Sequence, residues 1–142
     1  MDRTQILFCT RVIEMKNWGP YFWGTLHIAC LTAPPVLSEE HKFAFEALVQ
    51  SFTFVLPCPA CQMHFREILN KFPIQNNTRT ELFIWSVHVH NEVNKSLGKP
   101  LVDPQEAFEY WAPRTNYEET FPVQDALVIL GLVAAISFLL LK

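Results

Sequence analysis

The sequence predicts an all-α fold, a four-helix bundle plus a short fifth helix, followed by a C-terminal transmembrane helix. Along most of the chain, apolar residues recur at the three- and four-residue spacing of a helix face, and no segment alternates as a half-buried strand does. Prolines, glycines and N-capping residues separate five helical segments. With 142 residues, 50% of them hydrophobic, the chain is long enough for one compact domain with a buried core.

The first two helices are bounded by prolines. We expect the first to begin at Trp18–Pro20, because a proline in the first turn has no helical hydrogen bond to lose, and to end near Leu31. The second is expected after Ser38, a good N-cap that precedes two glutamates in the first turn, where the helix dipole favours negative charge. It ends at Val55, because Pro57 follows closely.

The remaining helices are predicted from the same signals. The third begins at Cys58-Pro59 and ends near Phe72-Pro73, and the fourth runs from Thr78–Thr80 to Gly98. A short fifth helix is expected over about Pro104–Trp111, before a polar linker.

The C-terminal stretch is the most hydrophobic part of the chain. Ala126–Leu141 carries no charge and is followed by Lys142. As a helix it would be about 24 Å long against a hydrocarbon core of about 30 Å, so it is short for a span and Lys142 would reach the far surface. The alternative is a buried helix of the domain. Since Met1–Thr10 lacks the apolar run of a signal peptide, a lone C-terminal anchor predicts a tail-anchored protein with its domain on the cytosolic side.

Charge excludes one class of partner. The formal net charge is -3 and the sequence pI is about 5.9, and no run of Lys or Arg marks a phosphate-binding face. We therefore expect no nucleic acid as a partner.

The motif Cys58-Pro59-Ala60-Cys61 has three interpretations: a redox disulfide, half of a zinc site, or a structural disulfide. In a reducing compartment a C-x-x-C pair is typically catalytic or metal-binding, and its place between two helical patterns disfavours a thioredoxin fold. At a helix N-terminus, Cys58 would be stabilised as a thiolate. His64 extends the spacing to C-x2-C-x2-H, but a zinc site would need a fourth, distant ligand.

The predicted fourth helix has two chemically different faces. Leu82, Trp85, Val89 and Val93 form an apolar side. The opposite side holds a stripe made up of Ile84, His88, Asn91, Lys95 and Lys99, and Asn94 and His90 border it. Amide, imidazole and ammonium groups suit a ligand that combines phosphates with heteroaromatic rings, although a solvated face would look the same.

Three segments together resemble one family. They are Trp18–His27 ("WGPYFWGTLH"), Cys58–Cys61 ("CPAC") and His88–Pro100 ("HVHNEVNKSLGKP"), and they resemble the FAD-linked sulfhydryl oxidases of the Erv/ALR type. The resemblance covers about Lys16–Trp111. With its membrane anchor the chain is similar to short forms from large DNA viruses, which implies a viral membrane or virion.

The resemblance implies a homodimer that binds FAD, with no metal. Cys58 would exchange with the substrate thiol, and Cys61 would lie against the flavin ring. The implied FAD contacts are Trp18, Gly19, Trp23, His27, His88, Asn91, Val93, Asn94, Lys95, Lys99 and Trp111. The implied domains are an N-terminal segment (1–15), the FAD-binding oxidase domain (16–112), a linker (113–125) and the anchor (126–141).

The implied activity is thiol oxidation. A protein dithiol, presented by a thioredoxin-like partner, would be oxidised through the Cys58–Cys61 disulfide, and its electrons would pass through FAD to molecular oxygen, giving hydrogen peroxide. Cellular members carry a further disulfide beside the fourth helix, but no cysteine follows Cys61 here. We expect Cys30 to be a small buried residue. The alternative is a membrane-anchored helical scaffold with a structural disulfide or zinc site.

Overall fold

The predicted all-helical architecture is confirmed. The computed structural model describes the backbone of residues 3–115 and the side chains of residues 17–115. The helices are α1 (Arg3–Thr32), α2 (Glu39–Val55), α3 (Pro59–Lys71), α4 (Arg79–Ser96) and α5 (Pro104–Trp111), followed by a 3-10 turn, η1 (Ala112–Arg114). The predicted anchor, residues 126–141, and most of the predicted linker lie outside the described residues. Within the described part, no helix has both the length and the apolar character needed to cross a membrane.

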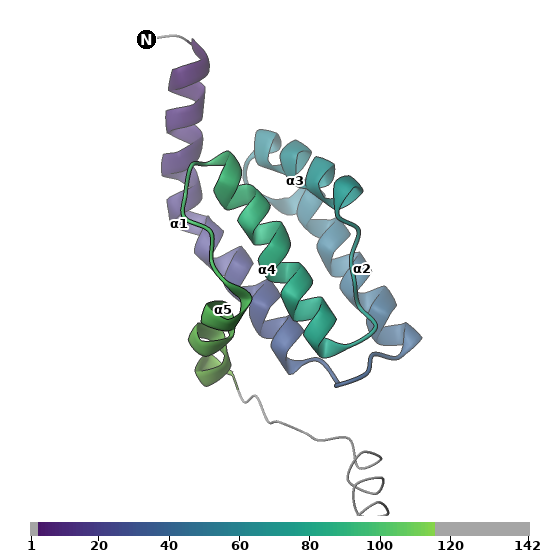
Figure 1. Cartoon of the computed structure of the whole chain (residues 1–142). Coiled ribbons are helices and arrows are strands. Elements are labelled where there is room, and N and C mark those ends of the chain that lie inside the picture. The colour runs from purple at the N-terminus through teal and green to yellow at the C-terminus, as the bar shows by residue number, and fades with distance from the viewer. Residues whose placement is uncertain (1–2, 116–142) are drawn as a thin grey trace, which may run out of the picture.

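Two helix pairs form the bundle. α1 packs along α4, α2 packs along α3, and α3 and α4 join the pairs (Figure 1). The short α5 packs against α4, and η1 returns to α1. The site described below is enclosed by α1, α4 and α5 on one side and by the α2–α3 connection on the other.

The predicted start of the first helix is wrong. α1 begins at Arg3, and Pro20 lies inside it. Residues 3–17 contain no proline or glycine, so nothing in their sequence ends the helix. Pro20 removes one helical hydrogen bond, but α1 continues through it, and the rings of Trp18 and Phe22 on either side pack edge to face at 5.6 Å. The first turns of α1 extend beyond the other helices (Figure 1).

The other helix boundaries agree closely with the prediction, because each is fixed by capping residues that lie next to it in the sequence. The side chains of Ser38, Thr78 and Asp103 accept hydrogen bonds from backbone N–H groups in the first turns of α2, α4 and α5. α4 ends at Ser96, and Gly98 follows with a φ of 65°, a left-handed conformation that glycine adopts without a steric penalty.

The core confirms the predicted apolar face of the fourth helix, since Leu82, Trp85, Val89 and Val93 are all buried. Cys30 is also fully buried with a free thiol, as expected. Burial raises the pKa of this thiol to about 12, so it is uncharged and unreactive.

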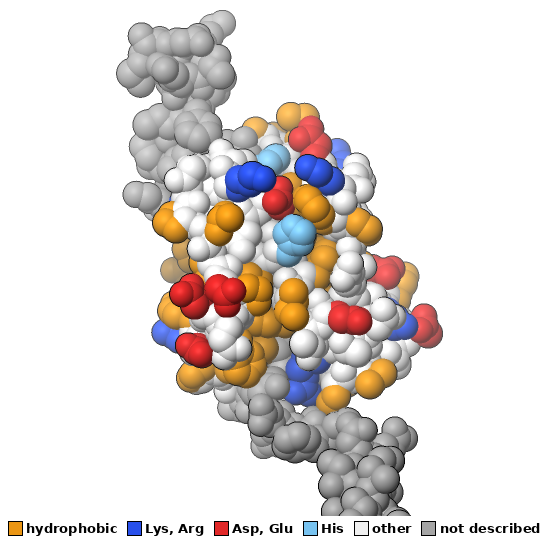
Figure 2. Space-filling model, viewed as in Figure 1, with side chains coloured by type: hydrophobic (Ala, Val, Ile, Leu, Met, Phe, Trp, Pro, Cys, Tyr) orange, Lys and Arg blue, Asp and Glu red, His pale blue; other side chains and the backbone are white. Residues whose placement is uncertain are grey.

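The surface carries mixed charge. On the face shown in Figure 2, Lys and Arg side chains are scattered among acidic ones, and acidic side chains gather over α5. The exposed acidic residues of that segment are Asp103, Glu106 and Glu109. The absence of a nucleic-acid partner stays a prediction.

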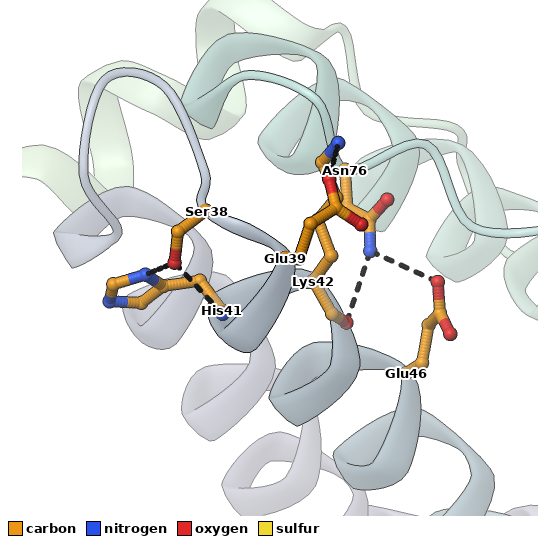
Figure 3. A network of polar contacts seen from close by, with 6 residues as sticks. All are labelled: Ser38, Glu39, His41, Lys42, Glu46 and Asn76. Carbon is orange, nitrogen blue, oxygen red and sulfur yellow. Dashed lines mark hydrogen bonds and ion pairs between the residues drawn. The ribbon is translucent and has the colours of Figure 1, made fainter.

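A polar contact fixes the connection between α3 and α4. The buried side chain of Asn76 donates from Nδ2 to the carbonyl of Lys42 at 3.2 Å and to Oε1 of Glu46 at 3.4 Å (Figure 3). The next residue, Asn77, accepts a backbone hydrogen bond from Leu37 at 3.0 Å. The α3–α4 connection is therefore tied to α2 and to the α1–α2 connection.

Replacing Asn76 by alanine should lower the free energy of unfolding by about 1–2 kcal/mol, because the hydrogen bonds to α2 are lost from a buried position. Urea denaturation measures this change. The matched control is Asn77→Ala, whose side chain is exposed, and it should stay within about 0.5 kcal/mol of the wild type. Equal effects of the two substitutions would contradict the role given to Asn76.

Candidate functional site

Cys58 and Cys61 form a disulfide at the junction of α2 and α3, with their Cα atoms 5.1 Å apart. Cys58 is the N-cap of α3 in an extended conformation, and its Sγ accepts a hydrogen bond from the N–H of Cys61 at 3.2 Å. Gln62 donates from Nε2 to the carbonyls of Phe54 and Leu56, both at 2.8 Å. The motif is therefore held in a rigid turn, with one sulfur at the positive end of a helix.

A narrow apolar cavity of about 30 Å³ lies against the inner cysteine. Cys61 lines it, and Cys58 does not. The other lining residues are mostly aromatic: Trp18, Phe22, Trp23, Phe52, Leu56, His64, Phe65 and Val93. Nε1 of Trp18 is buried without a hydrogen-bond partner, which is a costly state for an N–H donor unless a ligand satisfies it.

Two larger cavities continue from this one toward α5. The second, of about 280 Å³, shares Trp23 and Val93 with the first. The third, of about 350 Å³, shares His90, Tyr110 and Trp111 with the second. The three adjoining cavities form a row from the disulfide to α5, and we call it the cavity row.

A polar cluster between α1 and α4 borders the cavity row. The Nδ1 atom of His27 lies 2.9 Å from Oγ of Ser86, and its Nε2 atom lies 3.0 Å from Nδ1 of His90. The ring of Trp23 stacks on His90, with centroids 4.0 Å apart and an interplanar angle of 9°. These contacts fix the planes of both imidazoles.

Both imidazoles of this cluster are uncharged at neutral pH. Burial, and then the nearby His90, lowers the pKa of His27 to about 3. Burial, and then the charge of Lys99, lowers the pKa of His90 to about 4. The cluster therefore acts through hydrogen bonds rather than through charge.

Two glycines of α1 border this region for different reasons. Gly19 lines the second cavity and is buried, yet a Cβ atom at this position would meet nothing within 4 Å. At Gly24, a Cβ would lie 3.1 Å from the ring of Trp111. Gly24 thus lets Trp111 pack against α1, and Gly19 leaves open space in the cavity row.

Comparison with known proteins identifies the family. Residues 20–112 match the Erv1 / Alr family. The chain belongs to this family. The disulfide and the cavity row both lie almost entirely within the matched residues.

The similar proteins of known description are viral and cellular Erv-type oxidases. A probable FAD-linked sulfhydryl oxidase of Acanthamoeba polyphaga mimivirus is 33% identical over 97 residues, covering 66% of this chain and 68% of the relative. An FAD-linked sulfhydryl oxidase of African swine fever virus is 32% identical over 88 residues, covering 62% of this chain and 74% of the relative. The crystal structure of the FAD-binding domain of Erv1 from Saccharomyces cerevisiae has a TM-score of 0.64 at 27% identity, and the match covers 67% of this chain and 90% of that domain.

The structure brings most of the predicted site residues together. The predicted residues that line the cavity row are Cys61, Trp18, Gly19, Trp23, His27, Asn91, Val93, Asn94, Lys99 and Trp111. Cys58 lies outside it, at the disulfide. Two predicted residues, His88 and Lys95, line none of the three cavities. His88 is exposed, and its ring lies 4.6 Å from that of Phe72.

The site also contains residues that were not among the implied FAD contacts, above all His90, Phe22 and Tyr110. His90, Asn94 and Leu97 lie at helical spacing i, i+4 and i+7 and all line the second cavity. Asn94 was among the predicted contacts, and the residue one helical turn before it is His90, not His88. The sequence therefore contained a signal that favoured His90.

Asn91 has a structural role as well as a place at the third cavity. Its Nδ2 donates to the carbonyl of Val102 at 2.8 Å, and its Oδ1 accepts from the N–H of Val102 at 3.0 Å. Asn91 thus fastens the α4–α5 connection to α4, and its amide group is already paired.

The metal alternative finds no support in the geometry. Among the described residues, no group of three or more His, Cys, Asp or Glu side chains is arranged to hold a metal ion. The two sulfurs proposed as zinc ligands are bonded to each other.

The buried histidines should make stability depend on pH in mild acid. A histidine in the unfolded chain has a pKa of about 6.5, whereas His27 and His90 have pKa values of about 3 and about 4 when folded. Between these values the unfolded chain binds more protons. The free energy of unfolding should therefore fall as the pH drops below about 6.5, by up to about 1.4 kcal/mol per pH unit for each histidine.

Chemical denaturation at a series of pH values measures this slope. Replacing His27 by glutamine should flatten it, because one buried imidazole no longer resists protonation. The exposed His88→Gln variant is the control and should follow the wild-type curve. A wild-type slope that persists in His27→Gln would show that other groups cause the acid sensitivity.

Proposed function

We propose that this protein is an FAD-dependent sulfhydryl oxidase that forms disulfides in partner proteins through Cys58 and Cys61, with molecular oxygen as the final acceptor and hydrogen peroxide as the product. The observation that carries the proposal is the position of Cys61. It belongs to a disulfide and also lines the first cavity of a row that is suited to an elongated ligand.

The cavity row fits FAD in three respects. The unpartnered Nε1 of Trp18 needs an acceptor, and the space beside Gly19 is filled by no protein atom. The rings of Trp23, His90 and Trp111 offer flat apolar surfaces for heteroaromatic rings.

Polar side chains on α4 and in the connection that follows it also suit FAD. Asn94 and Lys99 border the second cavity, where an ammonium group can pair with a phosphate. The residues that would hold FAD are the lining residues of the cavity row. When bound there, FAD supplies an acceptor for the two electrons of a dithiol and passes them on to oxygen.

The protein's own part of the reaction is thiol–disulfide exchange. A thiolate of the partner attacks Sγ of Cys58, so that a bond forms between these two sulfurs, the Cys58–Cys61 bond breaks, and Cys61 leaves as a thiolate. The partner's second thiolate then attacks the partner sulfur of the mixed disulfide. This releases Cys58 and leaves a disulfide in the partner, so both electrons now reside on the reduced Cys58–Cys61 pair.

The geometry separates the roles of the two cysteines. Cys58 lies outside the cavity row, in the α2–α3 connection, and is itself only 7% exposed. Its neighbours Pro57 and Pro59 are exposed, so this connection is the place where a partner can reach the disulfide. The N-terminus of α3 and the N–H of Cys61 stabilise negative charge on its sulfur when it leaves. Cys61 faces the cavity, so the sulfur next to the cofactor is the one freed by the first exchange.

The proposal includes a homodimer. Large apolar side chains are exposed on α1 and α2, among them Tyr21 (76%) and Phe43 (73%). These two helices are neighbours, since Phe22 and Phe52 pack at 5.3 Å. A second copy of the chain covering both helices would remove such side chains from water.

The proposal also includes a thioredoxin-like partner and a membrane location. A dithiol in a small, rigid partner suits exchange with a disulfide held in a tight turn. The uncharged stretch at residues 126–141 supports a tail anchor in a cellular or viral membrane, with the oxidase domain on the cytosolic side.

Single cysteine substitutions test the function. Cys58→Ser and Cys61→Ser should both abolish oxygen consumption with a model dithiol, because neither can form the disulfide. Cys58→Ser leaves a free sulfur against the cavity and should change the visible absorption of bound FAD, whereas Cys61→Ser should not. Cys30→Ala is the control and should keep its turnover, since that buried thiol takes no part in the disulfide. A colourless wild-type protein would favour the scaffold alternative.

Truncation tests the anchor. A chain that ends at Asp125 should remain in solution, keep FAD and oxidise a small dithiol, because every lining residue of the cavity row precedes η1. Oxidation of a membrane-bound partner should slow, since anchoring on one surface raises the effective concentration of both proteins. Sedimentation with vesicles and a flavin spectrum measure these outcomes. A truncated chain that aggregates without flavin would instead make residues 126–141 part of the core.

A further inference from the structure

The polar cluster between α1 and α4 contains one residue that the proposed function does not use, Ser86. We propose that Ser86 is a positioning residue that fixes the tautomers of His27 and His90, so that His90 presents an unprotonated Nε2 atom to the cavity row. The inference rests on the proposed function only in naming FAD as the ligand that meets this atom.

The donor and acceptor roles in the cluster follow from Ser86, which is fully buried on α4. Its hydroxyl donates to the carbonyl of Phe83 at 2.7 Å, the shortest contact in the cluster. The Cys30 thiol also forms a hydrogen bond with this hydroxyl. A serine hydroxyl has a single proton and two lone pairs, so Oγ can take part in its two further bonds only as an acceptor. The atom facing it, Nδ1 of His27 at 2.9 Å, must therefore carry a proton.

The tautomer of His27 then determines that of His90. A neutral imidazole with a proton on Nδ1 has none on Nε2. Nε2 of His27 is therefore an acceptor, and its neighbour at 3.0 Å, Nδ1 of His90, must donate. Since burial keeps both rings neutral at pH 7, the remaining nitrogen of His90, Nε2, is left without a proton.

This nitrogen is available to a ligand. His90 lines both the second and the third cavity, and no described residue forms a hydrogen bond with its Nε2. The stacked ring of Trp23 holds the imidazole plane, so the direction of the lone pair is fixed as well. Ser86 thus determines, through His27, the hydrogen-bonding character of a cavity wall that it does not itself line.

An unprotonated Nε2 selects one class of chemical group. It accepts from an N–H or O–H donor, such as an exocyclic amine or a sugar hydroxyl, and it repels a phosphate oxygen. The cation for phosphates in the same cavity is Lys99. The two residues therefore divide the second cavity between a donor group and an anionic group of FAD.

Nitrogen NMR of the full chain, labelled in histidine and loaded with FAD at pH 7, tests the assignment. The chain has 5 histidines, and two-bond correlations distinguish the nitrogen that carries the proton in each ring. We expect protons on Nδ1 of both His27 and His90. A proton on Nε2 of His90 would overturn the proposal, and this measurement needs no substitution.

Replacing Ser86 by alanine should release the constraint. His90 should then show Nε2–H, at least in part, and FAD binding measured by flavin fluorescence should weaken by up to about tenfold, the worth of one net hydrogen bond. Unchanged tautomers in Ser86→Ala would also overturn the proposal.

The matched control is Ser96→Ala. Ser96 makes the same type of bond on the same helix, from Oγ to the carbonyl of Val93 at 2.8 Å, but contacts no histidine. It should leave the tautomers and the FAD affinity at wild-type values. A chain that binds no FAD would overturn the proposed function, while the tautomers of His27 and His90 would still be read from the same spectra.

Discussion

The contact between α1 and α4 is the constraint on which the site depends. Trp23 and His27 lie one helical turn apart on α1, and both contact His90 on α4. Burying two imidazoles is costly unless their nitrogens are paired, so each ring requires a partner at a fixed place on the other helix. This requirement sets how α1 and α4 are aligned, and the cavity row opens along the line where they meet.

The disulfide is positioned by short-range interactions, unlike the α1–α4 contact. The turn around Cys58 is held by short-range interactions: an N-cap, a proline at the start of α3 and the two hydrogen bonds of Gln62. The α1–α4 contact joins residues about sixty positions apart in sequence. The two parts meet at Leu56 and Cys61, which belong to the turn and to α3 and also line the first cavity. The disulfide is therefore placed by local interactions, and the long-range contact shapes the second and third cavities beyond it.

The same distinction explains what the sequence could predict. Caps such as Ser38 and Thr78 act within three residues, so helix boundaries were readable from local sequence. The start of α1 could not be predicted in this way, because whether a proline ends a helix depends on what the neighbouring side chains pack against. His88 and His90 point about 200° apart around α4, and the position of α1 decides which one is enclosed. The motif as a whole was predictable, and the spacing from Asn94 favours His90 over His88. The pairing of His90 with His27 and its stacking on Trp23 depend on the position of α1, which the local sequence does not give.

The burial of Asn76 has a consequence for modification of the chain. Asn76-Asn77-Thr78 and Asn94-Lys95-Ser96 both have the acceptor pattern for N-linked sugars. A glycan would be attached to the Nδ2 atom of Asn76, which is the atom that donates to Lys42 and Glu46, and Asn94 is buried at the second cavity. In the folded chain neither Nδ2 atom is open to a glycan, because Asn76 is held by its hydrogen bonds to α2 and Asn94 lies buried in the wall of the second cavity.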